Sequence, residues 1–234
     1  MAIGIVGAMD VEVAIIREAM KDPQVTTVAG MDFYSGTIAG RDVILVKCGI
    51  GKINAALCVQ ILADRFGVEA VINEGIAGAL DPELEIGDFV ISKTAIQHDV
   101  DLRIFGYPLG MLGSNAPREW TADPVLGEKI MNYLSSQEDA TRKVKYGRIV
   151  SGDQFIADDE KKAFLVSEFE GTCAEMEGAA IAHAATLNKI PFVILRAISD
   201  KADGSGNVDY PTFEKKMAHF MGHTMVEMLE KGVF

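Results

Sequence analysis

The sequence predicts an α/β fold with a largely parallel sheet and helices on both of its faces. Short apolar segments alternate with segments of helical periodicity, as in chains that join parallel strands through crossover helices. The apolar segments are nearly continuous in Val, Ile and Ala, which is typical of strands buried on both faces. One early pair of apolar segments is joined by a tight turn, so the sheet is expected to be mixed.

The N-terminal part of the chain is predicted to form a strand, a helix and a hairpin. Residues 2–7 are an apolar run that ends in glycine, which is typical of a buried strand. Asp10 is placed to cap the helix that follows, because its apolar residues recur at helical spacing. Residues 32–38 and 43–47 are predicted as the two strands of the hairpin, which turns at residues 39–41.

The alternation continues through the middle of the chain. Residues 51–66 have one apolar face at helical spacing and are predicted to be a helix. Residues 69–73 form a short strand, which is expected to be broken by Gly75 and Gly78 because glycine weakens a strand interior. A longer strand is predicted over residues 87–97.

The second half begins with a predicted loop at residues 106–120, which are rich in Gly and Pro. Helical and strand patterns then alternate to the C-terminus. The predicted helices lie at residues 124–134, 158–167, 177–187 and 210–231, and the predicted strands at residues 144–150, 172–176 and 191–198. No repeat, low-complexity tract or linker divides the chain, so residues 1–234 are expected to form one domain.

Composition narrows the class of protein. Hydrophobic residues make up 49% and charged residues 24% of the 234 residues, which suits a globular protein with a large core. The net charge of −12 argues against nucleic acid or an anionic membrane as a partner, because both are polyanions. No apolar run approaches the ~18 residues of a membrane span, and residues 1–9 lack the basic start of a signal peptide. We expect a cytoplasmic protein.

The motifs of common cofactors are missing from the sequence. Gly4 and Gly7 do not complete a GxGxxG pattern and no P-loop lysine follows them, which argues against a dinucleotide or ATP site. Cys48, Cys58 and Cys173 show no CxxC spacing and are expected to be reduced, buried thiols. We therefore expect no cofactor and no structural metal.

Polar and charged residues follow several of the predicted strands, where ligands bind in an open α/β sheet. Glu12, Glu175, Glu177 and Asp200 lie at such positions, together with Arg196. Some of these residues can also be explained by a structural role alone. Glu12 can be a solvated residue of a first helical turn, and Asp200 can cap the turn after its strand. Their common position at strand ends nevertheless predicts a binding site.

Five motifs in colinear order resemble those of the 5′-methylthioadenosine/S-adenosylhomocysteine nucleosidases, a branch of the nucleoside phosphorylase family, over essentially the whole chain. The motifs are Gly4-Ile-Val-Gly-Ala-Met-Asp-Val-Glu12, Gly49-Ile-Gly-Lys-Ile-Asn-Ala55, Ser151-Gly-Asp-Gln-Phe155, Ala174-Glu-Met-Glu-Gly178 and Arg196-Ala-Ile-Ser-Asp200. The resemblance implies a three-layer αβα sandwich around a mixed, partly barrelled central sheet. It also implies a homodimer.

The implied reaction is hydrolysis of an N-glycosidic bond, which releases adenine and a 5-thio-substituted ribose through an oxocarbenium-like state. By similarity, Asp200 is the general acid at adenine N7 and Glu12 is the base that activates water. Glu177 matches the carboxylate that binds the ribose hydroxyls. Arg196 would help to hold Glu12 and the water, and Ser199 would orient the loop.

Further residues match positions that surround the substrate in the family. Phe155 matches an aromatic side chain that stacks on the purine, and Met176 one that packs on the ribose. Phe105 and Tyr107 match residues that reach the partner's site across the dimer interface. The remaining substrate-binding residues implied by the resemblance are Met9, Ile50, Gly78, Ile156, Glu175 and Tyr210, of which Met9, Ile50 and Tyr210 would wall the 5′-alkylthio pocket.

The sequence departs from the family at several positions. Ile76 stands where many members have serine, Glu74 replaces a small polar residue, Ala79 replaces a glycine, and the loop at residues 111–115 also differs. Other functions remain open. A purine nucleoside phosphorylase of the same fold needs basic residues for phosphate, and no arginine lies near Gly7. A futalosine-type nucleosidase is poorly separated by sequence. A carboxylate-bound Mg²⁺ enzyme and a nucleoside-binding module are the alternatives from other classes.

Overall fold

The computed structural model describes residues 2–137, 142–202 and 210–234, with the side chains of the last segment described from residue 213. The strands are β1 (Ile3–Gly7), β2 (Lys21–Val28), β3 (Met31–Ile38), β4 (Arg41–Lys47), β5 (Ala70–Ala79), β6 (Phe89–Gln97), β7 (Trp120–Thr121), β8 (Val144–Ser151), β9 (Cys173–Glu175) and β10 (Phe192–Asp200). The helices are α1 (Asp10–Ala19), α2 (Lys52–Ile61), α3 (Pro124–Ser135), α4 (Asp159–Phe169), α5 (Gly178–Leu187) and α6 (Tyr210–Glu230), with short turns at Leu62–Phe66 and Arg103–Phe105.

The strands form one mixed sheet in the order β10-β6-β8-β9-β5-β1-β4-β3-β2. A further pairing joins β10 to β5, so β5, β10, β6, β8 and β9 close into a barrel. The pairs around β1 are parallel, whereas the β2–β3–β4 meander is antiparallel. The predicted mixed, partly barrelled sheet is confirmed.

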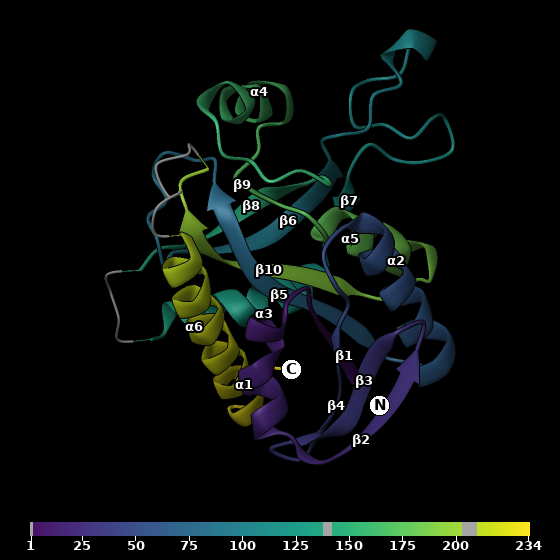
Figure 1. Ribbon diagram of the computed structural model, residues 1–234, viewed down its shortest axis with the longest axis vertical. Helices are drawn as coiled ribbons and strands as arrows, with labels where there is room; N and C mark the ends of the chain where they lie inside the picture. Colours follow the sequence, from purple (N-terminus) through teal and green to yellow (C-terminus); the bar gives the residue numbers. More distant parts are fainter. Residues whose placement is uncertain (1, 138–141, 203–209) are drawn as a thin grey trace.

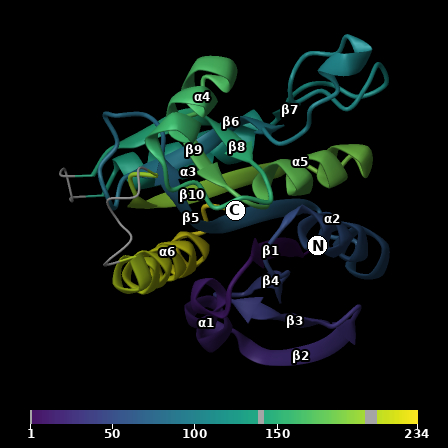
Figure 2. The same cartoon turned by 45° about the horizontal axis from the view of Figure 1, so that its top comes forward.

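Helices cover both faces of the sheet (Figures 1 and 2). On one face α1, α3 and α6 contribute to a core with Ile5, Ile72 and Leu195. On the other face α2 and α5 pack on a core that includes Val6 and Val71. Because successive residues of a buried strand point to opposite faces, both faces of these strands are apolar. Three layers result.

Polar side chains define where two of the helices begin. Asp123 accepts hydrogen bonds from the N–H groups of Val125 and Leu126 at the start of α3, and Asp158 accepts one from Lys161 at the start of α4. The expectation that Asp10 caps α1 is wrong. Met9 is its N-cap residue, and the Glu12 carboxylate rather than Asp10 bonds the free N–H groups there. A side chain that caps a helix is therefore also a candidate for the site.

Two other expectations about strands are wrong. β5 does not end at Asn73 but continues through Gly75 and Gly78, because parallel β10 pairs with it along this whole stretch. β2 has no counterpart among the predicted elements. It is an almost wholly exposed edge strand that contains Pro23, and its irregular pairing with β3 leaves no alternating pattern in the sequence.

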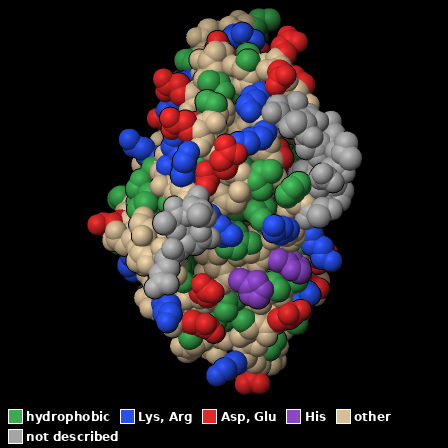
Figure 3. All heavy atoms as spheres, turned by 90° about the vertical axis from the view of Figure 1, so that its left-hand side faces the viewer, with side chains coloured by type: hydrophobic (Ala, Val, Ile, Leu, Met, Phe, Trp, Pro, Cys, Tyr) green, Lys and Arg blue, Asp and Glu red, His purple; other side chains and the backbone are tan. Residues whose placement is uncertain are grey.

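The surface carries a mixture of charges. On the face that shows α6, acidic and basic side chains are both scattered among apolar ones (Figure 3). No helix in the described part of the chain has the length and apolar character needed to cross a membrane. Cys48, Cys58 and Cys173 are free and buried, as predicted.

Candidate active site

A cavity of about 340 Å³ lies beyond the carboxyl ends of β1, β5 and β10. Its lining includes most of the residues that the sequence singled out. They are Met9, Glu12, Ile50, Gly78, Phe155, Glu175, Met176, Glu177, Ser199 and Asp200. The structure thus brings together residues from six separate parts of the chain, as expected for a site at strand ends.

Glu12 is held at the N-terminus of α1 and is 3% exposed. Its Oε2 accepts hydrogen bonds from the N–H groups of Ala8 (2.7 Å) and Met9 (2.9 Å), and its Oε1 accepts one from Ile76 (3.2 Å). Burial raises the pKa of Glu12, while the Arg196 charge and these N–H groups oppose that rise. Backbone N–H groups can only donate, so the arrangement favours the carboxylate as an anion.

Gly75 makes room for this arrangement. A Cβ on Gly75 would lie 2.5 Å from Glu12 Oε1 and 3.2 Å from Arg196 Nη1. Any side chain at this position would therefore collide with the Glu12 carboxylate or separate it from the guanidinium. The glycine that was expected to break β5 is instead needed where the strand passes the site.

Arg196 is fully buried below the cavity and does not line it. Its Nη2 donates to Glu175 Oε2 (2.6 Å) and to Asn73 Oδ1 (2.6 Å). Burial acts to lower the pKa of Arg196, but the charges of Glu175 and Glu12 outweigh it and raise that pKa. The expected contact with Glu12 is thus a charge interaction, whereas the hydrogen-bonded ion pair is with Glu175.

The Glu175 carboxylate is saturated by protein donors. Besides Arg196, it accepts from the Ser151 hydroxyl and from the N–H groups of Glu177 (3.1 Å) and Gly178 (2.7 Å). These N–H groups lie at the start of α5, where the helix dipole also favours an anion. Glu175 therefore ties Arg196 to the N-terminus of α5, although it also borders the cavity.

Glu177 is the N-cap residue of α5 and is 6% exposed. Its Oε1 accepts a hydrogen bond from the N–H of Gly51 (2.8 Å), which joins the start of α2 to the start of α5. Burial and the nearby Glu175 charge raise the pKa of Glu177. With one donor from the described residues, this carboxyl still has capacity to bind ligand hydroxyls.

Asp200 is the last residue of β10 and is 9% exposed. The Ser199 hydroxyl donates to Asp200 Oδ2 (2.8 Å), and the N–H of Ala202 donates to Oδ1 (2.8 Å). A Cβ on Gly78 would lie 2.8 Å from Oδ1, so Gly78 allows the carboxyl to lie against β5. Ser199 and Gly78 together determine where the Asp200 carboxyl points.

The apolar walls come from different elements. Met9 and Ile50 border the cavity near Glu12, and Met176 borders it between the two glutamates of the Glu-Met-Glu motif. The Phe155 side chain is half exposed at the rim. Ile156 lines a smaller adjoining pocket that shares Gly78, Phe155 and Asp200 with the cavity. A flat apolar ligand could contact these walls while its polar edges meet the carboxyls.

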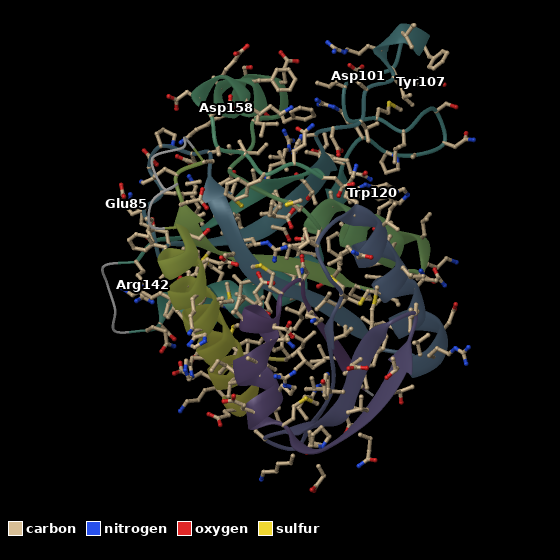
Figure 4. All side chains as sticks on the ribbon, in the orientation of Figure 1. Glu85, Asp101, Tyr107, Trp120, Arg142 and Asp158 are labelled. Carbon is tan, nitrogen blue, oxygen red and sulfur yellow. The ribbon has the colours of Figure 1, made fainter. Side chains whose placement is uncertain are left out.

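Two predicted residues are not brought to the cavity of their own chain. Phe105 and Tyr107 belong to the segment after β6 that extends beyond the sheet, and Figure 4 shows Tyr107 there. Tyr210 begins α6, but its side chain lies outside the described residues.

Sequence reasoning missed other residues. Glu214 of α6 lines the cavity, and Asn73 and Ser151 hold Arg196 and Glu175. Glu214 resembles any charged residue of a surface helix in the sequence. Asn73 and Ser151 precede residues that were singled out, and a polar residue inside an apolar strand was the available signal.

The charged residues described at the cavity lining are all acidic. Among the described residues that line it, none is Lys or Arg. The described residues also hold no group of three or more His, Cys, Asp or Glu side chains arranged to bind a metal. The donors around Glu175 are N–H, O–H and guanidinium groups, which suit a carboxylate and not a cation.

The fold and the site define an α/β protein that is equipped for acid–base chemistry on a small neutral or cationic ligand. The family model described as the phosphorylase superfamily matches residues 2–229. The chain belongs to this family.

Relatives of known name cover the whole chain. It is 38% identical to a 5′-methylthioadenosine/S-adenosylhomocysteine nucleosidase of Staphylococcus epidermidis, over 97% of this chain and 99% of that protein. The nucleosidase of Colwellia psychrerythraea in complex with adenine has a TM-score of 0.92 and 38% identity, over 98% of this chain and 94% of that one. A futalosine hydrolase of Helicobacter pylori has a TM-score of 0.92 and 32% identity, over 99% and 98% of the two chains.

Proposed function

We propose that this protein hydrolyses the N-glycosidic bond of 5′-methylthioadenosine and S-adenosylhomocysteine to adenine and the 5-thio-substituted ribose. The observation that carries the proposal is the presence of Glu12 and Asp200 in one cavity. Glu12 is held by backbone N–H groups, and Asp200 by a hydroxyl and one N–H group. Its relatives of that name support the choice of substrate.

Glu12 acts as the base toward water. Its three N–H donors and the nearby Arg196 favour the anion, which can accept a proton from water as the bond to adenine breaks. The negative charge of Glu12 also stabilises the positive charge that develops on the ribose. Arg196 orients the site indirectly, because it holds Glu175 and thereby the start of α5.

Asp200 acts as the general acid at N7 of the departing adenine. A general acid must give up its proton to the leaving group and later regain one, so its partners must tolerate both states. The Ser199 hydroxyl can donate or accept a hydrogen bond and meets this requirement. Phe155 stacks on the purine, and Ile156 and Gly78 offer backbone contacts to it.

Glu177 binds the ribose hydroxyls, with Met176 packed on the sugar. Gly51 holds the Glu177 carboxyl through one hydrogen bond, so the remaining oxygen lone pairs can accept from hydroxyl groups. Met9, Ile50 and Tyr210 wall the 5′-alkylthio pocket. No step in this scheme uses a cofactor.

A lining of carboxylates without a described cation favours water over phosphate as the acceptor. Phosphate needs positive charge or many N–H donors, and the anions in the cavity would repel it. Incubation with methylthioadenosine, with and without phosphate, tests this choice. Free adenine and a reducing sugar at a rate independent of phosphate are expected, whereas formation of a sugar 1-phosphate would make the protein a phosphorylase.

Futalosine hydrolysis is the second candidate activity, because a futalosine hydrolase is among the similar structures. Cleavage of its glycosidic bond needs the same catalytic acid and base. Futalosine and methylthioadenosine differ in the 5′-substituent and in the nucleobase. Parallel assays with methylthioadenosine, adenosylhomocysteine and futalosine rank the activities by kcat/KM. A futalosine value above both others would reverse the order proposed here.

We also infer a homodimer. Ile104 and Phe105 are 88% and 72% exposed on the segment that extends beyond the sheet. Ile53 of α2 and Leu187 of α5 are exposed and line a hollow between these helices. Both helices lie on the same side of the molecule as that segment (Figures 1 and 2). Clustered exposed apolar side chains are typical of an interface. Phe105 and Tyr107 then reach the partner's cavity.

Mixing two inactive variants tests this arrangement. The double variant F105A/Y107A lacks the residues offered to the partner, whereas D200N lacks the acid of its own site. In a mixed dimer, one site keeps Asp200 together with the intact loop of the other chain. Activity should therefore return on mixing. Light scattering that shows a fully active monomer would contradict the dimer.

The place of the reaction in the cell follows from the substrate. Methylthioadenosine and adenosylhomocysteine are by-products of S-adenosylmethionine, so we propose a role in their recycling and in methionine salvage. The free, buried thiols of Cys48, Cys58 and Cys173 suit the reducing cytoplasm. Residues 1–234 act as one domain in this proposal.

A further inference from the structure

A fourth buried glutamate lies beside the site and takes no part in the scheme above. Glu74 of β5 is 1% exposed, and neither of its carboxyl oxygens has a hydrogen-bond partner among the described residues. Buried polar groups in native proteins are almost always hydrogen bonded, and an isolated buried anion is especially costly. This side chain therefore requires a physical explanation.

Glu74 and Glu12 approach each other across the bare Cα of Gly7. A Cβ on Gly7 would lie 2.8 Å from both Glu74 Oε1 and Val13 Cγ1, and 3.2 Å from Glu12 Cβ. Next along β5, Gly75 makes room for Glu12 Oε1 and Arg196 in the same way. Two glycines thus bring two carboxyl groups and one guanidinium into one small buried space.

The surroundings of Glu74 offer few other charges. Glu12 faces it from α1 and Arg196 from β10, and β1 contributes Gly7. On α6, Met217 and Ala218 cluster with Ile76 of β5, and Met221 belongs to the core cluster that includes Ile72, so these α6 residues bring no charge. Arg196 is thus the cation of this space, and its hydrogen bonds go to Asn73 and Glu175.

The four buried carboxyl groups differ in the hydrogen-bond donors that they receive. Glu12 accepts from three N–H groups, Glu175 from two N–H groups, a hydroxyl and Arg196, and Glu177 from one N–H group. Glu74 accepts from none in the described structure. Donors favour the ionised form, and like charges close together in a buried space cannot all ionise. Burial and the Glu12 charge raise the pKa of Glu74 well above its usual range.

We propose that Glu74 is a positioning residue that works in its protonated form and holds Glu12 as the single anion of the pair. The neutral carboxyl fills the space beside Gly7, so the Glu12 side chain stays against the N–H groups of Ala8, Met9 and Ile76. Because it is uncharged, Glu74 does not compete with Glu175 and Glu12 for the positive charge of Arg196. The proposal rests on the role of Glu12 in the proposed function, while the protonation state of Glu74 stands apart from it.

Three variants test the proposal. Glu74→Ala removes the side chain, and Glu74→Gln keeps its shape without a titratable group. The control is Glu69→Gln, since Glu69 directly precedes β5 and pairs with Arg41 near the surface. With methylthioadenosine, E74A should lower kcat about tenfold and change KM less than about twofold, because the base is displaced and ground-state binding is not. E74Q should recover most of the lost kcat.

The pH dependence separates positioning from a general loss of stability. If Glu74 is neutral, E74Q leaves the acid limb of kcat/KM at the wild-type pH, because no charge beside Glu12 has changed. If Glu74 is an anion, E74Q removes a like charge and moves that limb to lower pH by about one unit. Such a shift, or an E74A variant with wild-type kcat, would overturn the proposal.

Unfolding measured without substrate gives an independent answer. A glutamate that is protonated when folded and ionised when unfolded loses stability relative to glutamine as pH rises above its ordinary pKa. Between pH 5 and 8 the ratio of unfolding constants, wild type over E74Q, should rise by up to about tenfold per pH unit. The ratio for E69Q should stay flat. A flat ratio for E74Q as well would show that Glu74 is ionised in the folded protein.

If E74A does not fold, the wild-type protein still decides the protonation state. A buried protonated carboxyl has an infrared C=O band distinct from that of carboxylates. Because Asp200 and Glu177 can contribute such bands of their own, the band should be present in the wild type at pH 7 and weaker in E74Q by one carboxyl group. The absence of this difference would overturn the proposal, whatever the activity toward methylthioadenosine proves to be.

Discussion

The two ends of the cavity hold their carboxyl groups in different ways. Glu12 lies against three backbone N–H groups with a buried arginine nearby, whereas Asp200 lies against one N–H group and a hydroxyl. An N–H group can only donate and so favours the ionised form that a base needs before the reaction, while a hydroxyl can also accept from the protonated form that an acid needs. The chemistry of the partners therefore separates a base from an acid among residues of the same type.

The largest effect is expected when the acid end is broken. Asp200→Asn keeps the size of the side chain but cannot supply a proton to adenine. We expect kcat to fall by about 10²–10⁴-fold, the usual worth of a general acid, while substrate still binds. Steady-state kinetics and calorimetric titration with methylthioadenosine measure the two effects. Asp32→Asn, an exposed residue of β3, is the control. Turnover within about threefold of the wild type would remove Asp200 from the mechanism.

The base end should respond strongly but differently. In Glu12→Gln, the side-chain amide NH₂ would face a backbone N–H group, and neither can accept a hydrogen bond from the other. The substitution also removes the catalytic base. We expect adenine release to fall by about 10²-fold and the thermal midpoint to drop as well, because a helix cap is damaged. Single-turnover assays and thermal unfolding measure these changes. If E12Q hydrolyses normally, the base lies elsewhere and Glu177 becomes the next candidate.

A smaller change tests the role of the hydroxyl at the acid end. Ser199→Ala removes one hydrogen bond to Asp200 but leaves the N–H of Ala202 in place. A single hydrogen bond contributes about 1 kcal/mol, so kcat should fall by about two- to tenfold. The pH profile of kcat should move with it. An unchanged profile would mean that Ser199 does not tune the acid.

The smallest effect concerns a carboxylate that belongs to neither end. Glu214 of α6 adds negative charge to the cavity without contacting Glu12 or Asp200 through any observed hydrogen bond. Glu214→Gln should raise KM by about two- to fivefold for a 5′-substituent that ends in an ammonium group, a modest charge effect. The KM for methylthioadenosine, which has no such charge, should not change. Equal changes for both substrates would exclude charge recognition.

Much of the fold could be predicted from local pattern. The alternation of apolar strands with helical stripes located nearly every helix, because burial of one face imposes a period that neighbours in sequence reveal. The same pattern failed for β2, which is exposed and irregular, and for β5, where Gly75 and Gly78 suggested an end. An exposed edge strand such as β2 has no buried face, so its sequence shows no alternation of apolar and polar residues. A central strand such as β5 is stabilised by hydrogen bonds to strands that are far away in the sequence.

The candidate site was predictable to the level of positions but not of contacts. Ten of the fifteen residues named in the sequence line one cavity, since parallel strands end on the same side of a sheet. The assignment of Arg196 to Glu12 missed its hydrogen bonds to Glu175 and Asn73. Glu214 escaped notice because a charged residue on a surface helix is ordinary. Contacts between side chains depend on distances that no spacing along the chain encodes.

The sequence by itself determined the α/β class, the order of most elements, the motifs of the site and its acidic character. Tertiary structure alone decided that β5 and β10 close a barrel, that Glu12 receives three N–H donors and that Glu74 receives none from the residues that the structure describes. The reason is physical. Periodicity and capping depend on residues within a few positions of each other, whereas the ionisation of a buried carboxyl depends on donors and charges that distant strands bring to it.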